Sequence, residues 1–479
     1  MRNCFCLKLS LDRHFLTVAV LAFMAVSLLS ACSLQIPEPV MRVDPGETLH
    51  LYLQPLPQEA EPLTMRVALL SALRRDGQEI PLLEKPVHLS AVERIGRQTK
   101  LLQSQLPAGD YLGLNLHIDR ASIISENGSN ALLTAQEPQL LDQPFSIRPG
   151  QTTTLFLSLQ RHRLVTDGYR LTAQFSLWTA PPPLTELKGL VSHPVAGTLT
   201  LFEKKTPRVY SVLALGQQPS GVALDPANRI AYVALSAEDM LVTIDLDQEQ
   251  IERKIRLRAS DRPRRLSLVD HGRNLVVTLS GSNALSVVDT RLFREHRRIH
   301  FATPPKDVIP AVDGSNAYVI LPETNRIVLV DSERGSIDAS ITLVETPAFG
   351  CLSKDGSLLF MLTENSPDLL LIDSQTLQPR GRVFIGYGGS CLASTENGLI
   401  YVGLKNGEIL IIDPRVALAI DQFQTGGGVV DITLDQFENS LFVLTDRQEL
   451  EKYDMTSKKK LASLDLGMVG FELSVMGEL

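Results

Sequence analysis

Short runs of alternating apolar and polar residues fill most of the chain, and one such pattern repeats. An apolar run that ends in an acid recurs every 40 to 44 residues. In the last six units a second apolar run lies 12 or 13 residues upstream of the acid, and turn-forming residues such as Asp313-Gly314 connect apolar runs. This arrangement predicts successive β-hairpins. The recurring acids are Glu203, Asp245, Asp289, Asp331, Asp373, Asp413 and Asp454.

The length of the unit predicts the fold. About 42 residues with four short strands is the size of one propeller blade. The C-terminal segment 470–479 starts like the first strand of a further unit, whereas residues 187–212 supply a second, third and fourth strand without a first. The sequence therefore predicts a seven-bladed β-propeller over residues 187–479, closed by the C-terminal strand. We expect the recurring acid to cap the turn before the fourth strand by accepting backbone N–H groups.

A different pattern precedes the repeats. Residues 40–180 contain alternating runs broken by Pro and Gly, for example Thr48 to Leu53 and Tyr111 to Ile118, which predict a β-sandwich. The chain is thus expected to be all-β, and the proline-rich residues 181–186 to be a linker. Two segments, Leu106 to Ile118 and Phe145 to Leu159, resemble a transthyretin-like sandwich family of bacterial surface lipoproteins.

The N-terminus has the composition of an export signal. Basic residues precede an uncharged apolar run from Phe15 to Leu29, which is shorter than the roughly 20 residues that cross a bilayer. Leu29-Ser30-Ala31-Cys32 resembles the bacterial lipobox. That resemblance implies a signal peptide over residues 1–31, acyl chains such as palmitate on Cys32, and a membrane tether over residues 32–39. The alternative is an ordinary secretory signal with a cysteine there by chance.

The resemblance to lipoproteins also bears on location and charge. In diderm lipoproteins a serine after the lipidated cysteine, here Ser33, favours the outer membrane, with a periplasmic or a surface orientation left open. Removal of residues 1–31 changes the formal charge from −8 to −10, which argues against a nucleic-acid partner. Cys351 and Cys391 lack CxxC spacing and are either buried thiols or a disulfide.

No cofactor or metal site is expected. His296 and His300 are four residues apart on a predicted outermost strand, a span of roughly 13 Å that one metal ion cannot bridge. They lie among Arg294, Arg297 and Arg298, and this composition is typical of a strand edge protected by charge.

The repeats resemble the YVTN-type repeats of bacterial surface propellers, which are related to lactonase-like seven-bladed propellers. That resemblance implies a fold more than an activity, because propellers include hydrolases, lyases, redox enzymes and scaffolds. The chain has no GxSxG, HExxH or P-loop motif, and we find no paired carboxylates at the expected channel.

Propeller ligands commonly bind at the central channel, so the loops that lead into the innermost strands are the candidate site. Arg262, Arg264 and Arg265 form a basic group in one loop, and Lys306 and Asp431 lie in or after two others. They predict either a site for an anionic ligand or partner, or merely solvated loops, with Asp431 pairing with an arginine. The triple glycine 426–428 is either an anion cradle or a tight turn.

Three functions remain open. The leading hypothesis is a noncatalytic envelope lipoprotein whose propeller binds another envelope protein or a polysaccharide. The second is a lactonase-like hydrolase or lyase at the channel, and the third is an accessory of surface electron-transfer proteins. A channel lined by apolar residues and isolated arginines would overturn the enzyme hypothesis, whereas clustered carboxylates or a bound divalent metal ion would overturn the noncatalytic one.

Overall fold

We describe a computed structural model of the chain from residue 47 to residue 477, except residues 91–95, 126–127, 161–163 and 313. The predicted signal peptide, Cys32 and the tether lie outside these residues. Within them, no helix is long and apolar enough to cross a bilayer. The helices are single 3₁₀ turns: η1 (Gln58–Ala60), η2 (Thr185–Leu187), η3 (Ser236–Glu238) and η4 (Pro322–Thr324).

The predicted sandwich is present as two sheets and a short hairpin. The first sheet contains, in order, β13 (Phe175–Trp178), β10 (Thr152–Leu159), β1 (Thr48–Leu53) and β5 (Thr99–Gln105). The second contains β3 (Glu79–Pro81), β2 (Leu63–Arg74), β6 (Gly109–Ser125) and β7 (Gly128–Leu132), with β4 (Val87–Ser90), β8 (Gln139–Leu141) and β9 (Phe145–Ile147) paired to β2 or β6. The hairpin is β11 (Val165–Thr166) with β12 (Arg170–Leu171).

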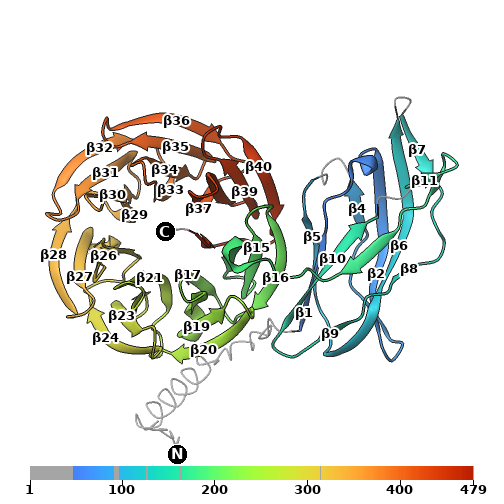
Figure 1. Ribbon diagram of the computed structural model, residues 1–479, viewed down its shortest axis with the longest axis horizontal. Coiled ribbons are helices and arrows are strands. Elements are labelled where there is room, and N and C mark those ends of the chain that lie inside the picture. Colours follow the sequence, from blue (N-terminus) through green and yellow to red (C-terminus); the bar gives the residue numbers. More distant parts are fainter. Residues whose placement is uncertain (1–46, 91–95, 126–127, 161–163, 313, 478–479) are drawn as a thin grey trace, which may run out of the picture. The chain divides into compact units, whose positions relative to one another are not determined.

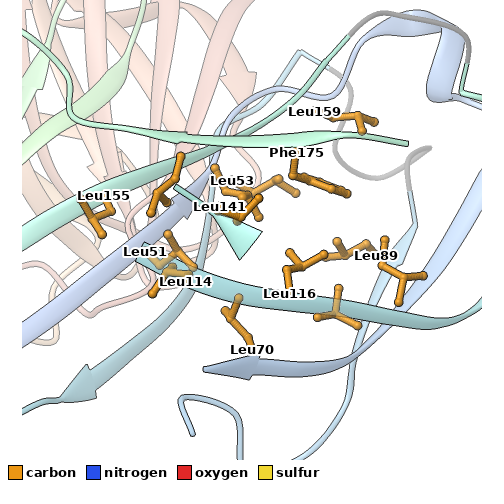
Figure 2. Close-up of a cluster of buried hydrophobic side chains, with 14 of the residues drawn as sticks. Leu51, Leu53, Leu70, Leu89, Leu114, Leu116, Leu141, Leu155, Leu159 and Phe175 are labelled. Carbon is orange, nitrogen blue, oxygen red and sulfur yellow. The ribbon is translucent and has the colours of Figure 1, made fainter. Parts of the chain in front are cut away.

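The sandwich has its own hydrophobic core, which follows from the alternation in its strands. Leu51 and Leu53 of β1 are fully buried, as is Leu114 of β6 on the other sheet. Because every second side chain of a strand lies on the same face, these leucines project between the sheets. Figure 2 shows these leucines in one buried cluster, with Phe175 of β13 at its edge.

Seven four-stranded antiparallel sheets follow and form a closed ring (Figure 1), which confirms the predicted seven-bladed propeller. Each blade is given from its innermost to its outermost strand. Blade 1 contains β17 (Pro219–Asp225), β18 (Ile230–Leu235), β19 (Met240–Asp245) and β20 (Gln250–Arg256); blade 2 contains β21 (Pro263–Val269), β22 (Asn274–Leu279), β23 (Ala284–Asp289) and β24 (Arg294–His300). Blade 3 contains β25 (Asp307–Pro310), β26 (Asn316–Leu321), β27 (Arg326–Asp331) and β28 (Ser336–Thr342).

The remaining blades repeat the same order. Blade 4 contains β29 (Pro347–Leu352), β30 (Leu358–Thr363), β31 (Asp368–Asp373) and β32 (Pro379–Phe384); blade 5 contains β33 (Gly389–Ser394), β34 (Ile400–Leu404), β35 (Glu408–Asp413) and β36 (Leu418–Gln424). Blade 6 contains β37 (Val429–Asp435), β38 (Ser440–Thr445), β39 (Glu449–Asp454) and β40 (Lys460–Asp465). Blade 7 contains β41 (Leu473–Val475), β14 (Lys188–His193), β15 (Thr198–Glu203) and β16 (Arg208–Ala214).

Blade 7 closes the ring as the sequence predicts, because its innermost strand comes from the C-terminus. Val191 of β14 pairs with Leu473 of β41, and Gly189 pairs with Val475. Pairing the two ends of the propeller removes the open sheet edges that a linear array of blades would expose.

The six recurring aspartates have the predicted role, whereas Glu203 accepts a hydrogen bond from the Thr206 hydroxyl. Asp245 Oδ1 accepts hydrogen bonds from the backbone amides of Asp247 and Gln248 at 2.8 Å each. Asp331 accepts the Arg334 amide in the same way. These bonds satisfy turn amides that have no partner in the strand ladder, so the marker acids are structural.

Candidate functional site

One residue per blade occupies the same register position at the start of the innermost strand, where the strands approach the axis. In six blades it follows the preceding acidic marker by 18 residues, and in blade 2 by 20. We call these seven residues the axial ring. They are Gly221, Arg265, Asp307, Phe349, Cys391, Asp431 and Glu472.

Arg265 is the centre of charge in the axial ring. Its Nη1 lies 3.0 Å from Glu472 Oε2, with the two side chains only 18% and 14% exposed. The guanidinium carbon also lies 4.8 Å from the centre of the Phe471 ring, a cation–π contact. Burial lowers the pKa of Arg265, but the carboxyls of Glu472, Asp307 and Asp431 outweigh it and raise the pKa. One guanidinium therefore interacts electrostatically with three carboxyls, of which Glu472 is in direct contact.

The same carboxyls join neighbouring blades. Each accepts a hydrogen bond from a backbone amide in the innermost strand of the following blade. The pairs are Asp307 with Gly350 N, Asp431 with Leu473 N at 2.8 Å, and Glu472 with Val222 N at 3.1 Å. Since a buried carboxylate needs such donors, these bonds account for its presence near the axis.

In the axial ring, one arginine, Arg265, faces three acids: Asp307, Asp431 and Glu472. Burial raises the pKa of Glu472 to about 7, although Arg265 opposes this. Burial likewise raises the pKa of Asp431 to about 6 against the same arginine, and it raises the pKa of Asp307. Part of the axial ring is therefore protonated near neutral pH.

A cavity of about 520 Å³ adjoins the axial ring. Asp307 and Glu472 contribute to its lining, together with the innermost strands of blades 3 to 6 and the turns that follow them. Ser394 lies on its wall, and Glu396 and Phe437 belong to the turns. The cavity therefore opens at the ends of the innermost strands, opposite the loops that lead into them.

The predicted site residues separate into two groups. Arg264, Arg265 and Asp431 lie at or beside the axial ring, and Arg264 stacks 5.4 Å from the Phe471 ring centre. Lys306 Nζ stacks 4.8 Å from the Phe349 ring centre and pairs with Glu364 Oε1 at 2.6 Å. None of these lines the cavity described above.

Arg262 is separate from this group. Its side chain is exposed, and its backbone amide donates to Asp239 Oδ1 at 2.8 Å in the neighbouring loop. The positive φ of Arg262, 49°, belongs to that tight turn. The loop brings two arginines to the axis and leaves the third in solvent.

The triple glycine is engaged by the protein's own acids. Gly426 N donates to Glu451 Oε2 at 3.0 Å, and Gly428 N donates to Asp446 Oδ1 at 2.8 Å. With carboxylates already on these amides, the segment is a turn with internal partners. An external anion would have to displace one of them.

The expectation of no paired carboxylates at the channel is wrong, because the axial ring brings together Asp307, Asp431 and Glu472. Asp431 was among the predicted site residues, but Asp307 and Glu472 were missed because the three acids come from different blades and form no linear motif. The repeat itself holds the signal, since all three lie 18 residues after an acidic marker. Comparing one position through all seven units would have found them.

Cys351 and Cys391 are both free thiols in the structure, not a disulfide. Burial raises the pKa of the Cys351 thiol to about 12 and raises that of Cys391 further. Thiols with raised pKa values are poor nucleophiles. Within the described residues, no group of three or more His, Cys, Asp or Glu side chains could hold a metal ion.

Comparisons with known proteins show no family for this chain. No family model matches the chain, and no curated protein matches it. Among solved structures, hydrazine synthase from Kuenenia stuttgartiensis is similar at 17% identity and a TM-score of 0.48, covering 53% of this chain and 88% of that one. Dihydro-heme d1 dehydrogenase NirN in complex with DHE is similar at 16% identity and a TM-score of 0.49, covering 63% and 78%. No argument about activity rests on these similarities.

Proposed function

We propose that this chain is a noncatalytic envelope lipoprotein whose propeller binds an envelope protein or a polysaccharide in the axial cavity. One observation carries the proposal: the cavity of about 520 Å³ adjoins carboxyls that already hold blade seams together. Its volume is in the range of ligand sites, roughly 300–1,000 Å³. Carboxyls that already interact with Arg265 and with backbone amides suit a structural and ligand-binding role better than proton transfer.

The proposed anchor is a lipid on Cys32, with the outer membrane as the proposed location. Leu29-Ser30-Ala31-Cys32 supports it, as do the uncharged apolar run before it and Ser33 after it. The resemblance of the sandwich to a transthyretin-like family and of the repeats to YVTN-type surface propellers fits an envelope protein. The sandwich then serves as the spacer between anchor and propeller.

Cys32→Ser is expected to abolish lipid attachment, because the thiol is the only group the modification can use. Cells fed an alkyne-tagged palmitate should label the wild-type chain and leave this variant unlabelled. Cys351→Ser, which removes a buried thiol, is the matched control and should stay labelled. Equal labelling of Cys32→Ser and the wild type would contradict the anchor.

Ser394→Phe is expected to abolish partner binding, because the added ring fills the cavity wall. The tagged full chain, extracted from envelopes in detergent, should recover a partner that the variant loses at least tenfold. Val195→Phe is the matched control, since it adds the same ring to a residue that is 94% exposed. A partner recovered equally with Ser394→Phe would place binding elsewhere.

The three clustered carboxyls of the axial ring are the observation expected of an enzyme, and they make the hydrolase the second candidate. The noncatalytic role is still proposed because Arg265 and backbone amides already engage these carboxyls. Glu472 lines the cavity, and a carboxyl with a pKa of about 7 is suited to general acid–base catalysis. The test is a panel of lactones offered to the full chain and to Glu472→Gln. Hydrolysis that is lost in the variant would replace the binding proposal, and no hydrolysis by either protein would support it.

A further inference from the structure

Positive charge is concentrated in blades 1 and 2 of an otherwise acidic protein. Residues 250–300 contain 12 of the 46 Lys and Arg residues but only 5 of the 54 Asp and Glu residues. This is a local excess of seven positive charges in a chain with a formal charge of −8. The segment runs from β20, the outermost strand of blade 1, to β24, the outermost strand of blade 2.

Some of these basic side chains serve the propeller itself. Arg298 is 6% exposed and pairs with Asp261 at 2.7 Å and Glu295 at 2.6 Å. Arg253 and Arg297 donate to backbone carbonyls in the 3–4 turn of the next blade, at 3.0 Å each. These residues join neighbouring blades and are not available to a partner.

Arg262, Arg264 and Arg265 belong to the loop at the axis, and Arg273 pairs with Asp270. The other five Lys and Arg side chains are exposed, and with His296 and His300 they form what we call the basic rim. Among the residues that the structure describes, no carboxylate lies within ion-pair distance of its Lys and Arg members. Arg253 bonds to Arg291 O, so the two strands carrying the rim are adjacent, as Figure 1 shows for β20 and β24. The basic rim consists of Lys254, Arg256, Arg258, Arg291, Arg294, His296 and His300.

Edge protection does not account for the basic rim. A charged outermost strand discourages edge-to-edge pairing, and that need is the same in every blade. Yet β28 (Ser336–Thr342) and β36 (Leu418–Gln424) meet that need with one acid each, Asp338 and Asp421, and contain no Lys, Arg or His, so an edge does not require the number of cations that β20 and β24 carry. The earlier interpretation of His296 and its neighbours as a protected edge is therefore incomplete.

The composition of the basic rim indicates what kind of surface it binds. Protein interfaces depend on large apolar or aromatic side chains at their centre. Between residues 250 and 300 the only large apolar side chain that is exposed is Leu292, at 53%. Several cations without an apolar anchor fit a surface of many phosphates, for which each Lys or Arg contributes about a fivefold preference.

We propose that the basic rim docks the propeller on the anionic phospholipid headgroups of the membrane that carries its anchor. The inference rests on the proposed lipid at Cys32, because one tether raises the local concentration of headgroups near the rim. The 14 residues between Cys32 and Glu47 span at most about 50 Å.

The test uses a soluble chain that begins at Ser33 and therefore carries no lipid. Residues 45–479 form one compact unit, so this chain keeps every contact described above. It is sedimented with vesicles of phosphatidylcholine alone or with about one third phosphatidylglycerol, at low and high salt. We expect binding to the anionic vesicles only, weakening at least tenfold as screening increases.

The decisive variant replaces Lys254, Arg256 and Arg294 with Gln and is expected to bind anionic vesicles about a hundredfold more weakly. The matched control replaces Lys85, Arg148 and Lys459, exposed cations elsewhere, and should change binding less than threefold. Equal weakening of both would overturn the proposal, because net charge alone would then explain binding. Unchanged circular dichroism and melting temperature confirm that the variants fold.

Heparin serves as a soluble polyanion in a second arm. If heparin captures the chain but anionic vesicles do not bind it, the membrane proposal is overturned, and the basic rim binds an acidic polymer instead. Palmitate labelling of Cys32 in cells is scored separately. If the chain is labelled but does not bind anionic vesicles, the docking proposal is overturned and the lipid anchor stands. If the chain is not labelled but binds anionic vesicles, the anchor is overturned and the docking stands.

Discussion

Replacing Lys204 with methionine is expected to lower the free energy of unfolding by about 3–5 kcal/mol. Lys204 Nζ lies 2.5 Å from Asp435 Oδ2 and donates to the Met476 carbonyl at 2.6 Å. The two side chains are 6% and 0% exposed. Methionine replaces most of the volume but leaves the Asp435 carboxylate buried without its counter-ion. Urea unfolding followed by circular dichroism measures the change.

The matched control is Lys205→Met at the next, exposed position, which should change stability by less than about 0.5 kcal/mol. A Lys204→Met, Asp435→Asn double variant should recover part of the loss, because it removes the unpaired charge. If both single variants lost the same stability, the buried pair would not be what secures the C-terminal end of the ring.

Much of the fold could be predicted because each blade of a propeller repeats the same short sequence pattern. Asp245 and Asp331 mark their blades since each caps one turn that every blade needs. The missing first strand before Lys188 and the extra strand after Gly470 together predict closure, and β14 pairs with β41 as expected. Strand alternation was equally informative in the sandwich, where β1 has the bounds that the sequence suggests.

The candidate site could be predicted only in part. Arg264, Arg265 and Lys306 were found because basic residues are conspicuous in an acidic chain. Asp307 and Glu472 were not, because a carboxyl is ordinary in sequence and becomes unusual only through burial beside Arg265. The cavity was expected near the loops that enter the innermost strands, but it depends on how side chains fill the channel, and local patterns do not encode that packing.

Buried polar contacts hold neighbouring strands together both at the propeller axis and where the C-terminal strand closes the ring. Polar groups that satisfy each other hold the seams between the innermost strands. Glu472 joins blade 7 to blades 1 and 2, and Lys204 holds the end of β41 through the Met476 carbonyl. Polar seams of this kind cost desolvation but fix the register of the blades.

Arg265→Met is the second change with a large expected effect, and its size should depend on pH. Arg265 lowers the pKa values of Glu472, Asp431 and Asp307, which burial raises above their ordinary values. Carboxyls with raised folded-state pKa values favour folding below their unfolded pKa, near 4, and lose that contribution as the pH rises through the folded values. Without Arg265 these folded values rise further, so the variant loses more stability at high pH.

We therefore expect Arg265→Met to lose about 3–5 kcal/mol at pH 8 and about 1 kcal/mol at pH 4, where the carboxyls are protonated with or without the arginine. Urea unfolding at both pH values measures the difference. Arg264→Met is the matched control, since Arg264 stacks on the same Phe471 ring but is exposed and should show little pH dependence. A loss for Arg265→Met that is the same at pH 4 and pH 8 would mean that the arginine acts by packing alone. The axial ring would then have no role in the charge balance of the propeller, and Arg265 would not be the group that opposes the raised pKa of Glu472.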